Sequence, residues 1–207
     1  MYERTLWGSL WLPSQETLQV CHALLQDIEF FRLLVRIDKE LAAEVRAGGC
    51  ACGGVLHCGN FPRKPKGCPA EVRSEFEWRF SFCCNRCRCR ATPVSVRFLG
   101  QRGYLGLTMV LVSSQPAAQT AAAGRLSTTL DVPVRTVQRW RQWWRQQLPL
   151  TAFWQVASAR FMPPVATEQI PASLLERFVG NAGDVLLRLL VFLTPLTIGT
   201  IALSEGC

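Results

Sequence analysis

The sequence lacks the features that mark secreted scaffolds and membrane-spanning proteins. Ten cysteines among 207 residues are about 5%, below the ~8 to 10% typical of small disulfide-stapled scaffolds. No cleavable signal pattern follows Met1, since Glu3 and Arg4 precede any apolar run, so we expect a reducing cytoplasm. The apolar stretch 185–203 is interrupted by Arg188 and Pro195 and is too short for the ~20 residues of a membrane span.

Acidic side chains are scarce where basic side chains are dense. Residues 50–116 carry a net charge of +7 and residues 117–149 carry +4, whereas the flanks 1–49 and 150–207 carry −2 and −1. A solvated surface spreads its charge, so this concentration predicts a polyanionic partner for the central region. With 49% apolar and 18% charged residues, the chain can form one or two packed domains.

Eight of the ten cysteines fall between residues 50 and 89, in two groups. A structural zinc site needs four soft ligands, usually supplied as two close pairs on tight turns. The first pair is a C-x-C followed by Gly53-Gly54, which favour such a turn, and the second is a C-x-x-C. We therefore predict a zinc ribbon whose Zn²⁺ ligands are Cys50, Cys52, Cys84 and Cys87.

Alternatives to this ligand set remain open in the sequence. The C-x-C pair is tighter than the usual C-x-x-C, and Cys83, Cys89, His57 or Cys58 can each replace a ligand. Free cysteines can also simply fill core positions, and a redox dithiol is a third interpretation, although no thioredoxin-like pattern surrounds it. Cys21, Cys68 and Cys207 are interpreted as incidental.

Hydrophobic periodicity predicts the regular elements outside the cysteine groups. Helical spacing from Ser14, a plausible N-cap, to about Arg46 predicts one helix, or two broken by a short turn, ended by Gly48-Gly49. Strict alternation predicts a strand over residues 72–82, with Arg79 on its polar face. We also expect a strand at 94–99, a turn at 100–103, a buried helix or strand at 104–112, of which helix is favoured, and a helix at 172–193.

Residues 121–148 fit a helix-turn-helix, with the turn at 131–133 and a second helix starting after Pro133. Its expected inner face holds Val134, Val137, Trp140 and Trp144. The outer face then carries side chains that can read base edges, namely Arg135, Gln138, Arg139 and Gln142, while Arg141 and Arg145 are expected to meet phosphates. An ordinary basic helix pair packed through tryptophans fits the same spacing.

A short basic loop separates the two cysteine groups. Arg63, Lys64 and Lys66 are stiffened by two prolines, which lowers the cost of ordering the loop on a phosphate backbone. These three residues are candidate DNA contacts, although such loops are commonly only solvated.

Several segments together resemble short bacterial transposase-like proteins, which have a zinc ribbon followed by a helix-turn-helix and no catalytic domain. The segments are Cys50-Ala-Cys-Gly-Gly-Val-Leu-His57, Asn60-Phe-Pro-Arg-Lys-Pro-Lys-Gly67, Phe82-Cys-Cys84, Ser95-Val-Arg-Phe-Leu-Gly100, Arg139-Trp-Arg-Gln-Trp-Trp144 and Arg160-Phe-Met-Pro-Pro164. The resemblance implies binding of double-stranded DNA by a bacterial, nucleoid-associated protein of mobile-element origin, acting in recognition or regulation beside a separate recombinase.

The expected fold class is α+β, mostly helical, with a small antiparallel zinc-ribbon sheet followed by a helix-turn-helix bundle. The expected divisions are an N-terminal helical segment at 1–49, the zinc ribbon at 50–102, the helix-turn-helix at 103–150 and a helical tail at 151–207. A transposase centre needs three carboxylates that hold two metal ions on a mixed sheet, and the roughly 60 residues after the helix-turn-helix cannot house such a domain, so we expect no enzyme.

Two other functions compete with DNA binding. A protein-interaction adaptor is one, and self-association through the C-terminal helix is a related expectation. RNA binding is the other, if the aromatic face of Phe76, Trp78 and Phe80 were exposed to stack on bases.

Overall fold

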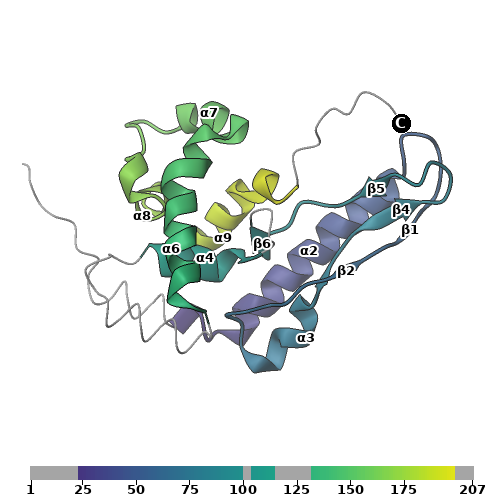
Figure 1. Cartoon of the computed structure of the whole chain (residues 1–207), viewed down its shortest axis with the longest axis horizontal. Coiled ribbons are helices and arrows are strands. Elements are labelled where there is room, and N and C mark those ends of the chain that lie inside the picture. Colours follow the sequence, from purple (N-terminus) through teal and green to yellow (C-terminus); the bar gives the residue numbers. More distant parts are fainter. Residues whose placement is uncertain (1–22, 100–103, 115–131, 199–207) are drawn as a thin grey trace, which may run out of the picture.

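The computed structural model describes residues 23–99, 104–114 and 132–198, and combines helices with small antiparallel sheets (Figure 1). The expected α+β class is confirmed at this level. The predicted N-cap Ser14, the turn at 100–103, the first helix of the helix-turn-helix and its turn residue Asp131 lie outside the described residues.

The longest element is α2, Ile28–Gly48. A short turn at 25–27 separates it from helical residues before it, and the side chain of Asp27 caps it by accepting a hydrogen bond from the backbone of Phe30. The helix ends as predicted, because Gly49 adopts φ 69°, a conformation that favours glycine.

Five short strands pack along α2 and form an elongated arm with it (Figure 1). A three-stranded antiparallel sheet has the order β1 (Leu56–Cys58), β4 (Phe82–Cys84), β5 (Arg90–Ala91), and β2 (Phe61–Pro62) pairs with β3 (Trp78–Arg79). We call residues 38–66 and 78–93 the arm. Its own small apolar cluster contains Ala42, Leu56, Phe82 and Cys84.

The predicted strand over residues 72–82 is wrong in its first half. Residues there form η1 (Ala70–Val72) and α3 (Arg73–Phe76), and strand begins only at Trp78. Val72 and Phe76 are four residues apart, so a helical turn buries both, and the Phe76 ring packs edge-on against Phe31 at 5.5 Å. Arg79 is also buried rather than on a polar face, and it donates to the carbonyl of Pro93.

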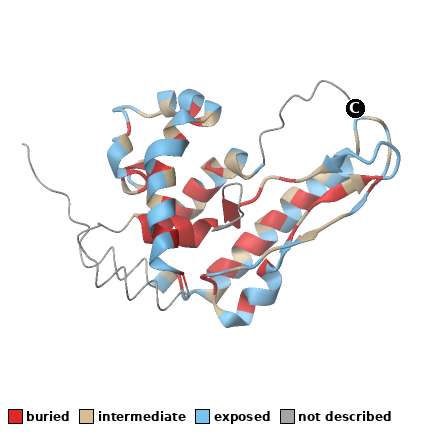
Figure 2. Cartoon of the chain, in the orientation of Figure 1, coloured by how far each residue is buried: buried red, intermediate tan, exposed pale blue. Residues whose placement is uncertain are grey.

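The main core lies beside the arm and is built around α4, Gly106–Ser113, whose residues are all buried (Figure 2). The favoured helix is confirmed from Gly106 onward, whereas residues 104–105 form a strand. The strand expected at 94–99 is reduced to β6 (Phe98–Leu99), which pairs with β7 (Tyr104–Leu105). One apolar cluster joins residues from all four expected divisions, including Leu34, Phe98, Trp144 and Leu189.

The short helices that follow α4 in the chain cover the main core. They are α6 (Val134–Gln142), η2 (Trp143–Gln147), η3 (Leu148–Leu150), α7 (Ala152–Ala157), η4 (Ser158–Arg160), η5 (Thr167–Gln169), α8 (Ala172–Leu175), α9 (Ala182–Phe192) and η6 (Thr194–Thr197). The single helix predicted at 172–193 is wrong, because Gly180 has φ 140° and Asn181 caps a new helix by accepting from the backbone of Asp184. Within the described residues, no helix is both long and apolar enough to span a membrane.

A buried ion pair joins α2 to the strand that returns from the arm. Asp38 and Arg97 are each 1% exposed, and Nε of Arg97 donates to Asp38 at 2.7 Å. The same carboxylate accepts from the Ser95 hydroxyl and from the backbone of Val96. These bonds hold residues 95–97 in an irregular conformation, which is why β6 starts only at Phe98.

Backbone carbonyls and aromatic rings also contact the Arg97 guanidinium. It donates to the carbonyls of Glu75 and Trp78 and lies 4.7 to 5.4 Å from the ring centroids of Phe80, Phe98 and Phe76. Burial lowers the pKa of the neighbouring Arg79 to about 10, so that side chain stays charged at neutral pH. Asp38 therefore balances a region that holds two buried guanidinium groups.

Replacing Asp38 by alanine is expected to destabilise the protein by about 3 to 5 kcal/mol, because Arg97 would be left buried without its partner. Denaturant unfolding monitored by circular dichroism measures this loss. Glu40→Ala changes an exposed acid on the same helix and should stay within about 0.5 kcal/mol of the parent. A similar small loss for Asp38→Ala would contradict the importance of the pair.

Candidate metal centre and nucleic-acid interface

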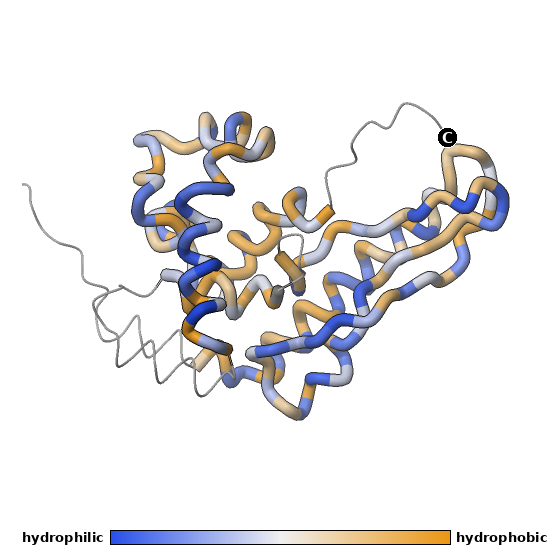
Figure 3. The backbone as a smooth tube through the Cα atoms, in the orientation of Figure 1, coloured by the Kyte–Doolittle hydropathy of each residue, from blue (hydrophilic) through white to orange (hydrophobic). Residues whose placement is uncertain are grey.

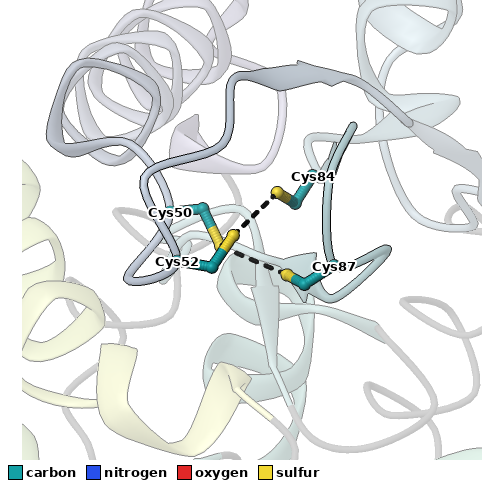
Figure 4. A group of neighbouring side chains, drawn as sticks. All are labelled: Cys50, Cys52, Cys84 and Cys87. Carbon is teal, nitrogen blue, oxygen red and sulfur yellow. Dashed lines mark hydrogen bonds between the residues drawn. The ribbon is translucent and has the colours of Figure 1, made fainter.

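The structure brings Cys50, Cys52, Cys84 and Cys87 together at the far end of the arm (Figures 1 and 4). The first two lie on the turn that follows α2, Cys84 is the last residue of β4, and Cys87 lies on the turn after it. All four sulfurs are within 4.8 Å of one another. Pairing of β1 with β4 places the two turns side by side, so residues far apart in sequence converge on one point.

The four sulfurs have the spacing of a tetrahedral metal site. Sγ of Cys52 lies 3.4 Å from that of Cys84 and 3.5 Å from that of Cys50, and Cys50 lies 3.5 Å from Cys87 (Figure 4). Zn–S bonds of about 2.3 Å in a tetrahedron separate the sulfurs by about 3.8 Å, so a small outward adjustment accommodates an ion. These four cysteines can bind a metal ion.

Backbone contacts hold the two turns in register with each other. The amide of Asn85 donates to the carbonyl of Val55 at 3.0 Å, and the Asn85 side chain accepts from the Val55 amide at 2.9 Å. Gly53 has φ 76°, which closes the first turn, and its amide donates to the carbonyl of Cys50. A Cβ atom added to Gly54 would lie 2.4 Å from Sγ of Cys84, so this position accommodates only glycine without a shift of the sulfur.

The protein environment favours thiolates at the second pair. The backbone N–H groups of Cys87 and Arg86 lower the pKa of Cys84 to about 6, although burial opposes them, and the pKa of Cys87 is lowered by the backbone of Cys89. At Cys50 the backbone of Cys52 favours the thiolate, but the neighbouring sulfurs outweigh it and raise the pKa to about 12. Four crowded thiolates repel one another, so full ionisation requires a cation.

The alternative ligands do not join this cluster. His57 pairs across the sheet with Cys83, whose sulfur donates to the carbonyls of Cys84 and Arg88 instead. Cys58 and Cys89 are exposed, and Cys68 is buried in the main core. Among the described residues, no other group of three or more His, Cys, Asp or Glu side chains has metal-binding geometry.

The helix α6 presents a polar face to solvent and an aromatic face to the core. Its outer side carries exposed Arg135, Gln138, Arg139 and Gln142, and the helix is hydrophilic over much of its length (Figure 3). Val137, Trp140 and Trp144 are buried as expected, with exposed fractions of 3% or less.

Two expectations for this helix need correction. Val134 is 57% exposed rather than on the inner face, because it lies in the first turn, beyond the edge of the core, where Val132 is buried instead. Arg141, expected to meet phosphates, is partly buried, and this burial lowers its pKa; Arg145 is exposed.

The basic loop between the cysteine groups lies along the arm. Lys64 and Lys66 are exposed, while Arg63 is partly buried and its guanidinium stacks 4.7 Å above the ring of Phe61. The aromatic face proposed for RNA is not displayed as a unit, because Phe76 is buried and Phe80 lies against Arg97, leaving Trp78 half exposed.

Three arginines beside the candidate metal ligands, Arg86, Arg88 and Arg90, were not predicted as site residues from the sequence. Arg86 donates to the carbonyl of Cys52 at 3.0 Å, and Arg90 donates to the carbonyl of Gly59 at 2.9 Å. Arg88 is exposed with φ 63°. Their signal was present in the sequence as a charge run around Cys87, but only the strand pairing shows which surface they share.

No protein-family model, no curated protein and no solved structure matches this chain. These comparisons therefore do not test the resemblance to transposase-like proteins.

Replacing Gly54 by alanine is expected to weaken metal binding by about 10- to 100-fold, because the added methyl group would displace Sγ of Cys84. Competition with a chromophoric chelator measures the affinity. Gly48→Ala is the matched control, since no atom lies within 4 Å of its added Cβ. Equal affinities for the two variants would contradict the close packing of the turn.

Removing the metal is expected to unfold the arm tip while the main core persists. The apolar cluster of the arm is small, so about 10 to 16 kcal/mol of apparent binding energy would supply its stability. Hydrogen exchange should then show lost amide protection at 50–58 and 82–91, with α4 unchanged. Simultaneous loss of protection in α4 would show instead that the two parts unfold together.

Proposed function

We propose that the protein is a zinc-stabilised, non-catalytic DNA-binding protein that recognises double-stranded DNA through α6. The observation that carries this proposal is the outer face of α6. Arg135, Gln138, Arg139 and Gln142 follow one another at helical spacing, and no acidic residue occurs between Asp131 and Glu168. Arginine and glutamine are side chains suited to guanine and adenine edges in a major groove.

Zinc is the ion that the ligand chemistry favours. Four sulfur ligands select soft or borderline metals, and a closed tetrahedral set is the usual form of a structural zinc site. Because all four positions would be occupied by protein, the centre would leave no coordination site for a substrate. The proposed role of zinc is therefore to stabilise the arm.

The resemblance to transposase-like proteins is consistent with this function. Within that proposal, the chain corresponds to a recognition part without catalytic machinery, acting as a regulator or beside a separate recombinase. Within this proposal, α6, which begins at Val134 directly after Pro133, is the second helix of the helix-turn-helix.

Arg135→Ala combined with Arg139→Ala is expected to weaken duplex binding at least tenfold, because each base contact contributes about 1 to 3 kcal/mol. Fluorescence anisotropy of the zinc-loaded protein with random-sequence and selected duplexes across a salt series measures this. Arg32→Ala with Arg36→Ala removes the same charge from exposed positions on α2 and should leave binding nearly unchanged. No binding by the folded parent at low salt would refute the function.

One observation favours a protein partner as a second candidate. Four phenylalanines from the C-terminal helices and their connections pack together while each remains partly exposed, with ring centroids 5.1 to 6.3 Å apart. These are Phe153, Phe161, Phe178 and Phe192, and the nearby sequence adds Val179 and Val191 at the surface. An adaptor or self-associating protein would use such a surface, and it would bind duplex DNA weakly in the same titration.

A further inference from the structure

The arm carries a one-sided concentration of positive charge that the function of α6 does not use. Strand pairing brings Arg90 of β5 and Arg63, which follows β2, onto the same aromatic ring. The guanidinium carbons of Arg63 and Arg90 lie 4.7 and 5.7 Å from the centroid of Phe61. Residues from both cysteine-bearing segments therefore meet midway along the arm.

These two arginines connect the basic loop to the metal centre. Lys64 follows Arg63 in the chain, and Arg86 and Arg88 flank Cys87 on the turn of the metal centre, where Arg86 binds the carbonyl of Cys52. We call Arg63, Lys64, Arg86, Arg88 and Arg90 the basic strip. No acidic residue occurs in the sequence between Glu44 and Glu71 or between Glu77 and Asp131, so the segments bearing the strip contain no carboxylates of their own. Exposed Glu77 is a neighbouring acid, since its backbone carbonyl accepts from the Arg63 amide, and one acid offsets only part of the strip's charge.

The strip stays positive when a metal is bound. Four thiolates with one divalent ion carry a formal charge of about −2, which offsets only part of the strip's five cations. Part of the strip is also ordered before any ligand binds, since Arg86 donates to the carbonyl of Cys52 and Arg90 to that of Gly59. Such pre-organisation lowers the entropy lost on binding a phosphate backbone.

The length of α2 sets how far the end of the strip at the metal turns lies from the main core, on which α6 packs. The helix has 21 residues, about 30 Å at 1.5 Å per residue, which is close to one turn of duplex DNA. Its N-terminal half contributes Phe31 and Leu34 to the main core, and its C-terminal half contributes Ala42 to the arm cluster. One continuous helix thus holds both parts, and α6 and the metal turns lie toward opposite ends of the molecule (Figure 1).

We propose that the basic strip is a second DNA contact, which binds the phosphate backbone of the same duplex that α6 reads, so that the footprint exceeds one helical turn. This inference rests on the proposed DNA-binding function. The exposed amide of Asn85, next to Arg86, is held by the backbone of Val55, and the five cations of the strip suit phosphates, so the strip would add affinity without sequence preference. Because the strip surrounds the metal turns, its contribution would depend on metal loading.

The test compares Lys64→Gln combined with Arg88→Asn against the parent on duplexes of about 12 and about 30 base pairs. Both residues are exposed, and asparagine tolerates the positive φ of Arg88. On the long duplex, the negative slope of log affinity against log salt should become shallower by about 2, since each lost phosphate contact removes roughly 0.9 from its magnitude. On the short duplex the change should be much smaller, and sequence preference should be retained on both.

Controls separate failure of this inference from failure of the proposed function. Arg32→Gln with Arg36→Gln removes equal charge from α2 and should preserve the slope on both duplexes, and a metal titration verifies that each variant is loaded. If the strip variant keeps the parental slope while Arg135→Ala with Arg139→Ala loses affinity, the second contact is refuted and the function stands. If the parent binds neither duplex, both proposals fail.

Discussion

The ion pair between Asp38 and Arg97 is the interaction on which the relation between the two parts of the molecule depends. Asp38 lies midway along α2, between the residues that enter the main core and those that enter the arm cluster. Arg97 lies where the chain leaves the arm, and it also binds carbonyls of the α3–β3 segment. Since both charges are buried, separating the segments would leave an uncompensated charge, which favours one arrangement of arm and core.

The two parts differ in how they are stabilised. Among the described residues, the main core buries thirty apolar side chains, five of them from α4, whereas the arm cluster consists of four buried residues, one of which is the candidate ligand Cys84. Short strands with so little apolar burial are marginal without additional bonds. Metal coordination would provide them at the tip, and the Asp38–Arg97 pair provides them at the base, so the outer strands depend on both ends of the arm.

Features encoded by neighbouring residues could be predicted from the sequence, whereas features decided by distant partners could not. The C-x-C and C-x-x-C spacings placed Cys50, Cys52, Cys84 and Cys87 on tight turns, and the structure brings them together. The alternation through Val72 and Phe76 fitted a strand and a helical turn equally well, and packing on Phe31 decided for the turn. The pairing of Asp38 with Arg97 spans 59 residues, and no local pattern identifies it. The surface shared by Arg63 and Arg90 likewise arises only from strand pairing.

The distribution of acidic residues explains why the positive charge of the arm is concentrated on its strands rather than on α2. The exposed side of α2 mixes both signs, with Glu29 paired to Arg32 at 2.7 Å and Glu40 and Glu44 farther along. The strand segment between Glu44 and Glu71 carries basic residues and no acidic residue. The strands therefore supply the positive potential, while the helix supplies length and rigidity. In the proposed DNA complex, such a field would attract the duplex at low ionic strength and hold it along the strands. The placement of the charge, rather than its total, would then suit an extended polyanion better than a small anionic ligand.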